Sequence, residues 1–275
     1  MSNTVTVWEK PGSIAEYFWR NGKLDFPVYD MHGHMGKHNA IYMKRCEPAE
    51  MAAHLRRAGV KRLIFAHHET LWGSRRNLAD YQVCKEYPDL FRMYVSINPH
   101  FPEYVKEDLA QFDSFQPYAV GLKILADYHR VPVTDKRYEY ALSFAEERKI
   151  PVLFHTWGGS TFNGGERMLE LALKYPNIRI FLGHSLFGDW EKAAECVQKA
   201  PLGNVYLELT ASPGEYGKVE MLCKKVGSEK ILFGTDQPWF DEHQAIGGIV
   251  SADITEEDMR NILYRNAERI LGKDF

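Results

Sequence analysis

Residues 28–34 read VYDMHGH, the first apolar, β-rich run of the chain, and this run ends in two histidines that flank one glycine. An apolar run of this length predicts a buried strand. An open, doubly wound α/β sheet normally carries a glycine-rich loop after its first strand. His32-Gly33-His34 is not such a loop, so the stretch favours a different kind of parallel sheet.

Seven further β-rich segments follow, separated by helical patterns. The predicted strands cover residues 28–34, 62–67, 92–98, 119–125, 150–156, 179–185, 205–211 and 231–236. The predicted helices cover residues 14–20, 48–58, 74–87, 102–115, 135–149, 164–175, 189–199, 213–226 and 255–271. Eight strand–helix repeats predict an α/β fold, a parallel sheet closed into a (β/α)8 TIM barrel. We expect a single domain over residues 1–275, in which residues 1–27 are an N-terminal extension.

Composition argues against several classes of function. Lys and Arg total 34 against 37 for Asp and Glu, so the net charge is −3 and nothing points to nucleic acid or a membrane surface as partner. No apolar run has the length of a membrane span, and no signal peptide is visible. The four cysteines form no C-x-x-C pair, which favours a reducing, cytoplasmic setting. We expect a small-molecule substrate, and a homo-oligomer is compatible with the sequence.

Side chains that bind metals or titrate stand at the ends of several predicted strands, where barrel enzymes place their active sites. His32 and His34 are two residues apart, so they face the same side of the first strand, with Cα atoms about 6–7 Å apart. The fifth, sixth and eighth strands end in His155, His184 and Asp236. Imidazole nitrogen and carboxylate oxygen are common zinc ligands. Because strands eight and one are neighbours in a closed barrel, these residues predict one metal site.

Three other residues are candidate contacts for a substrate. Lys123 lies near the end of the fourth strand, and His129 and Arg130 follow it, which favours a substrate that carries a carboxylate. Glu208 faces the interior from the seventh strand, where it is expected either to pair with Lys123 or to contact the substrate. Trp157 follows the fifth strand and is expected to line the pocket. His67 and His68 end the second strand, but no spacing argument makes them ligands.

Several short motifs together resemble the amidohydrolase superfamily. They are Asp30-Met31-His32-Gly33-His34, Gly121-Leu122-Lys123, Val152-Leu153-Phe154-His155-Thr156, Gly183-His184-Ser185 and Phe233-Gly234-Thr235-Asp236-Gln237-Pro238. Within the superfamily they are most similar to the amidohydrolase-related group that includes aminocarboxymuconate semialdehyde decarboxylase and lactone hydrolases. The resemblance runs from about residue 28 to residue 271.

The resemblance implies a role for each position. His32, His34, His155 and Asp236 match the family's metal ligands. His184 resembles the strand-six histidine that often contacts the metal-bound water or the substrate. Lys123 falls where binuclear relatives place a carbamylated lysine, and an unmodified lysine here implies one divalent metal ion. We expect this ion to be zinc.

The expected activity is hydrolysis of an ester, lactone or amide by a metal-activated water, because a divalent metal lowers the pKa of bound water toward neutrality. Asp236 is the expected general base and then acid, and His184 is expected to orient the water. Two alternatives stay open. One is non-oxidative decarboxylation of an unsaturated or aromatic carboxylic acid in the same pocket, and the other is a non-catalytic barrel with a structural metal.

Overall fold

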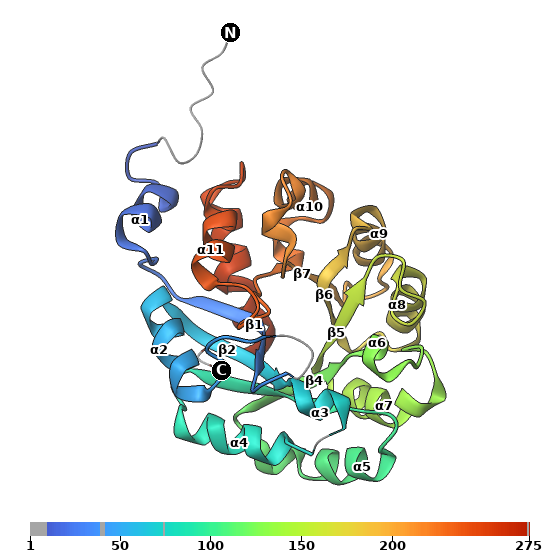
Figure 1. The fold of residues 1–275 in the computed structure, drawn as a ribbon. Helices are drawn as coiled ribbons and strands as arrows, with labels where there is room; N and C mark the ends of the chain where they lie inside the picture. Colours follow the sequence, from blue (N-terminus) through green and yellow to red (C-terminus); the bar gives the residue numbers. More distant parts are fainter. Residues whose placement is uncertain (1–9, 39–41, 74, 274) are drawn as a thin grey trace.

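Eight parallel strands form one continuous sheet in the order β1 to β8, and helices surround it (Figure 1). The computed structural model describes residues 10–38, 42–73, 75–273 and 275. Backbone hydrogen bonds join the last strand region to the first: Asp236 N–H donates to His32 O at 2.7 Å, and His34 N–H to Gln237 O at 2.7 Å. The sheet therefore closes on itself, and the predicted TIM barrel is confirmed.

The strands are β1 (Val28–Met35), β2 (Val60–His67), β3 (Phe91–Ile97), β4 (Ala119–Ile124), β5 (Pro151–Trp157), β6 (Arg179–Phe187), β7 (Val205–Glu208) and β8 (Ile231–Leu232). The α-helices are α1 (Ile14–Asn21), α2 (Pro48–Ala58), α3 (His68–Trp72), α4 (Asn77–Glu86), α5 (Pro102–Ala110), α6 (Ala126–His129), α7 (Glu139–Arg148), α8 (Gly165–Lys174), α9 (Trp190–Lys199), α10 (Lys218–Val226), α11 (Glu242–Val250), α12 (Glu256–Arg260) and α13 (Asn266–Leu271).

Two strands end several residues before their predicted ends: β7 stops three residues short of 211, and β8 stops four residues short of 236. Buried carboxylates take the backbone N–H groups that a longer ladder would use. Glu208 Oε1 accepts from Thr210 N at 2.7 Å, and Asp30 Oδ1 accepts from Thr235 N at 3.1 Å. A buried N–H needs a partner, and here a side chain supplies it. The two strand ends thus become irregular where the candidate site lies.

The predicted helices are found at the expected positions, but several of them are interrupted locally. The helix expected at 255–271 is interrupted by a π-helical turn, Asn261–Arg265, because the Ile262 carbonyl accepts a hydrogen bond from Phe233 N at 3.2 Å. The helix expected at 74–87 begins only at Asn77, and α3 precedes it; residue 74 lies outside the described residues. The segments 102–115, 135–149 and 213–226 each contain a short 3-10 turn beside an α-helix. These turns lie outside the strands and leave the barrel intact.

The interior of the barrel is apolar toward the N-terminal ends of the strands, its lower part, and polar at their C-terminal ends. Met31, Tyr94 and Phe181 fill the lower interior, and the Tyr94 hydroxyl donates to Met31 O at 2.9 Å. The larger core lies between the strands and the helices. The N-terminal helix α1 lies beside α11 (Figure 1). None of the described helices is long and apolar enough to cross a membrane.

Candidate metal centre and active site

His32 is held in one orientation by a buried carboxylate. Its Nδ1 lies 2.7 Å from Glu208 Oε2, and both side chains are fully buried. Because a carboxylate accepts, the hydrogen of the neutral ring lies on Nδ1, and Nε2 presents a lone pair. That Nε2 lies 2.7 Å from Lys123 Nζ and 3.3 Å from Asp236 Oδ1. A carboxylate behind a histidine is the usual support of a metal-ligating imidazole.

His34 reaches the same point from the same strand. Its Nδ1 lies 3.0 Å from the Ala66 carbonyl, so Nδ1–H donates and the Nε2 lone pair is free. This Nε2 lies 3.1 Å from Asp236 Oδ1, an atom that is buried and has no hydrogen-bond partner among the described residues. Three acceptor atoms therefore converge, and one of them, His32 Nε2, has Lys123 Nζ as a hydrogen-bond donor. Such a group repels itself unless a cation lies among its members, so the residues fit a metal ion.

His184 completes the group from β6. One ligand atom each of His32, His184 and Asp236 lies within 4.8 Å of the others. The backbone of His184, Ser185 and Leu186 is left-handed, with φ of 66°, 50° and 53°. Hydrogen bonds hold this strained turn, because His184 N donates to Glu208 Oε2 at 3.2 Å and Ser185 Oγ to the Glu208 carbonyl at 2.8 Å. His184 Nδ1 is buried and has no partner among the described residues.

His155 lies at the rim of this group. Its ring centroid is 4.7 Å from that of His184, and its side chain is 21% exposed. Its Nε2 lies 3.8 Å from Asp127 Oδ2, outside hydrogen-bonding distance. Trp157 stacks nearly parallel to His155 and is 41% exposed, so it faces the mouth of the barrel.

The predicted pair of Lys123 and Glu208 is separated by a third residue. His32 lies between them, with Lys123 on its Nε2 and Glu208 on its Nδ1. Glu208 also accepts from the Thr210 backbone and hydroxyl, at 2.7 and 2.6 Å. Both charged side chains are fully buried, so their positions depend on His32 and on each other.

His129 and Arg130 do not join the site. His129 is buried, with its Nδ1 2.7 Å from Tyr138 Oη and its Nε2 2.8 Å from the Leu71 carbonyl. Arg130 is exposed, in a left-handed turn after α6. Of the three groups from which a substrate carboxylate was inferred, only Lys123 lies beside His32.

His68 and Tyr128 are part of the site, although no pattern in the sequence selects them. The His68 ring stacks on His34, with centroids 3.9 Å apart and planes 2° apart. Its Nε2 lies 3.4 Å from Tyr128 Oη, and its buried Nδ1 has no partner within the described part of the chain. The ring centroid of Trp239 lies 5.1 Å from that of His68. The only signal in the sequence is a His-His pair at the end of the second strand.

Comparison with known proteins decides the family. The family model described as Amidohydrolase matches residues 23–273. The chain belongs to the amidohydrolase family. None of the curated protein sequences compared with it matches significantly. Membership makes the chain an enzyme, so the non-catalytic barrel is set aside.

Solved structures share the fold of this amidohydrolase at low identity. An uncharacterized TIM-barrel protein from Bordetella bronchiseptica is 17% identical, with a TM-score of 0.77 over 90% of this chain and 99% of that one. A 2,6-dihydroxybenzoate decarboxylase from Rhizobium is 15% identical, with a TM-score of 0.70 over 89% and 98%. A 5-carboxyvanillate decarboxylase from Novosphingobium aromaticivorans, solved with manganese, is 12% identical, with a TM-score of 0.72 over 90% and 97%.

The electrostatics of the amidohydrolase site favour neutral His32 and His184 beside an ionised Asp236. Burial lowers the pKa of His184 to about 4 and that of His32 well below its usual value. Burial alone would raise the pKa of Asp236, but His32 and His34 outweigh it and hold that pKa well below its usual value. Burial lowers the pKa of Lys123 to about 8, although Asp236 and Glu208 oppose the shift. These are the protonation states that metal ligands require.

A second group of potential ligands, His54, Asp241 and His243, lies outside the barrel centre. Arg45 and Arg57 both donate to His54 Nδ1, each at 3.1 Å. The His54 hydrogen is therefore on Nε2, which lies 3.1 Å from Asp241 Oδ2. A protonated nitrogen beside two guanidinium groups does not suit a cation, so this group is an ion-pair network between α2 and α11.

Proposed function

We propose that this amidohydrolase is a metal-dependent hydrolase that acts on an ester, lactone or amide of a small, carboxylate-bearing substrate. One observation carries the proposal. The Nε2 atoms of His32 and His34 both approach Asp236 Oδ1, at 3.3 and 3.1 Å, and their Nδ1 hydrogens are already used elsewhere. This arrangement is suited to a cation.

We infer that His32, His34 and Asp236 hold one divalent ion, with His155 as the fourth ligand and zinc as the ion. Three histidines and a carboxylate form a donor set typical of zinc. A bound divalent ion supplies Lewis-acid charge, which makes water more acidic and polarises a carbonyl group. Manganese is the ion named for the decarboxylase from Novosphingobium aromaticivorans, so metal add-back has to include it.

Asp236 and His184 are the proposed catalytic residues. Asp236 is ionised at neutral pH, so it accepts a proton from the attacking water and passes it to the leaving group. His184 is neutral, buried and fixed by its backbone, and its unpartnered Nδ1 is available to orient that water. We propose that Lys123, Trp157 and Glu208 serve the substrate: Trp157 by contact, Lys123 by its charge, and Glu208 through His32, which it orients.

Decarboxylation of an aromatic or unsaturated acid is the second candidate. The rings of His68, Tyr128, Trp239 and Trp157 lie around the metal centre, and such a lining suits a planar substrate. Two of the proteins with the same fold are named as decarboxylases of hydroxylated aromatic acids.

One experiment separates the two candidates. Enzyme loaded with zinc or manganese is incubated with lactones, esters, amides and aromatic and unsaturated carboxylic acids. Products are followed by chromatography and released CO2 by a coupled assay, with the Asp236→Asn enzyme as control. The proposal expects metal-dependent release of an acid without CO2. Stoichiometric CO2 would establish the second candidate, and no metal-dependent turnover of any compound would overturn both.

A further inference from the structure

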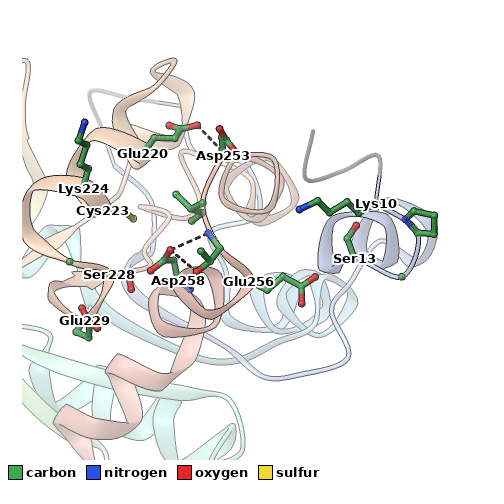
Figure 2. Close-up of a pocket in the computed structure, with 15 residues that line it drawn as sticks. Lys10, Ser13, Glu220, Cys223, Lys224, Ser228, Glu229, Asp253, Glu256 and Asp258 are labelled. Atoms are coloured by element: carbon green, nitrogen blue, oxygen red, sulfur yellow. Dashed lines mark hydrogen bonds between the residues drawn. The ribbon is translucent and has the colours of Figure 1, made fainter. Parts of the chain in front are cut away.

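A cavity of about 280 Å³ lies outside the barrel centre, between α2 and α4 and behind the ends of β1 and β2. None of its side chains takes part in the proposed reaction. It is lined by Met35, Gly36, Lys37, Glu47, Pro48, His67, Glu69, Arg76, Ala79, Asp80 and Val83. The larger cavity of about 850 Å³ in Figure 2 lies beside the residues that precede β8. Three of its acidic groups, Glu220, Glu256 and Asp258, already accept backbone hydrogen bonds, so it offers less to a ligand.

His67 gives the smaller cavity a hydrogen-bond donor of known position. Its Nδ1 accepts from the Glu69 backbone N–H at 3.2 Å, so the hydrogen of the neutral ring is on Nε2. The ring lies over Gly36, where an added Cβ would be 2.1 Å from Nε2. Within the described part of the chain, this Nε2–H donates to no acceptor. Burial lowers the pKa of His67 to about 4, so the ring is neutral.

Asp80 gives the cavity a buried acceptor. Its side chain is 1% exposed, and Oδ2 has no hydrogen-bond partner among the residues that the structure describes. A buried polar atom without a partner destabilises the protein, and a ligand that donates a hydrogen bond would recover this cost. Burial raises the pKa of this carboxyl well above its usual value.

The rim of the cavity carries opposite charges. Lys37 and Glu47 are exposed, and neither forms an ion pair with any residue in the described ranges. Arg76 Nη1 and Glu69 Oε2 lie 3.6 Å apart, a loose pair on another part of the rim. The cavity thus offers N–H groups and positive charge to an anion, and carboxyl oxygens to a donor.

We propose that this cavity binds a small carboxylic acid that also carries an amino or hydroxyl group, such as an α-amino acid or α-hydroxy acid. The ligand's carboxylate binds His67 Nε2–H and Lys37. Its amino or hydroxyl group donates to Asp80 and Glu47. A ligand with only one of these groups leaves half of the polar lining without a partner, so it binds more weakly.

The site adjoins the metal centre through two short backbone links. Gly36 follows His34 by two residues, and His67 directly precedes His68, whose ring stacks on His34. Although the two sites are close, binding of the small acid to the cavity is measured without turnover. The result of this measurement is therefore independent of the proposed function.

Isothermal titration calorimetry with the purified protein tests the proposal. The probes are glycine, L-serine, L-alanine, glycolate and L-lactate; acetate lacks the donor and ethanolamine lacks the carboxylate. The variants are Lys37→Met, Glu47→Gln and Asp80→Asn. Lys44→Met and Glu50→Gln are matched controls, because both residues are exposed and lie outside the cavity lining.

We expect at least one bifunctional probe to bind saturably, and more tightly than acetate and ethanolamine. Loss of a charged hydrogen-bonding partner should weaken it about 10-fold or more in Lys37→Met and Glu47→Gln, with wild-type affinity in both controls. Asp80 is buried, so the affinity of Asp80→Asn is interpreted only if the circular dichroism spectrum of this variant is native. The rim residues are exposed, so their variants carry no such risk of misfolding. No saturable binding up to about 10 mM, or equal binding by Lys37→Met and Lys44→Met, would overturn the proposal.

Discussion

The Nδ1 atom of His32 lies 2.7 Å from Oε2 of Glu208, and both side chains are fully buried. This contact determines which nitrogen of His32 faces Asp236. Glu208 also accepts from His184 N, so one carboxylate orients residues from two strands. The first prediction follows from this double role.

Glu208→Gln should weaken metal binding about 10–100-fold, the usual effect of removing the support of a metal-ligating histidine. Competition with a chromophoric chelator measures the affinity. Glu215→Gln, an exposed site after β7, is the control and should bind metal normally. Unchanged affinity in folded Glu208→Gln protein would limit Glu208 to a packing role.

His184→Asn should keep most of its metal and lose activity, whereas His32→Ala should lose both. The reason is that His32, His34, His155 and Asp236 already supply four ligands, while His184 Nδ1 has no partner among the described residues. Elemental analysis and kcat after add-back of Zn, Mn, Ni and Co measure the two effects. Comparable metal loss in both variants would make His184 a ligand.

Asp236→Asn should lower kcat about 10²-fold or more, because it removes the basic oxygen but keeps the shape of the side chain. The folded pKa of Asp236 is depressed, so the wild-type enzyme loses its base only as the pH falls through that low value. The acidic limb of the kcat/KM profile should vanish or move in the variant. Near-normal turnover by metal-replete Asp236→Asn enzyme would leave Asp236 as a ligand alone.

His68→Phe should raise KM about 10-fold and leave metal affinity unchanged. Phenylalanine keeps the ring that stacks on His34 but removes the unpartnered Nδ1, which we expect to contact the substrate. Tyr128→Phe should have a smaller effect, because the Tyr128 hydroxyl contacts His68 through Nε2. Steady-state kinetics and chelator competition provide the two readouts. A KM equal to that of the wild type would place Nδ1 outside the substrate site.

Lys123→Met should raise KM for an acidic substrate more than for its methyl ester, because the positive charge is lost. Burial lowers the pKa of Lys123 to about 8, so the charged form disappears as the pH rises through that value. Wild-type KM for the acid should therefore rise above about pH 8, with little change for the ester. Parallel effects on acid and ester would show that Lys123 does not hold the carboxylate.

The sequence by itself determined the barrel and the convergence of the main site. Eight alternating segments require a parallel sheet, and a parallel sheet brings every strand's C-terminal end to one face. Side chains alternate along a strand, so His32 and His34 had to share a side. These conclusions depend only on chain periodicity and topology, and both can be read from local patterns.

Only the tertiary structure decided where neighbouring side chains point once the strands end. His67 and His68 are adjacent, yet His68 stacks on His34 at the candidate metal centre and His67 lines the outer cavity. His129 turns into the protein to meet Tyr138, and His32 comes to lie between Lys123 and Glu208. The physical reason is that, beyond a strand end, a side chain's direction depends on backbone turns and hydrogen-bond partners distant in the sequence. The left-handed His184, held by Glu208 from the next strand, is such a case.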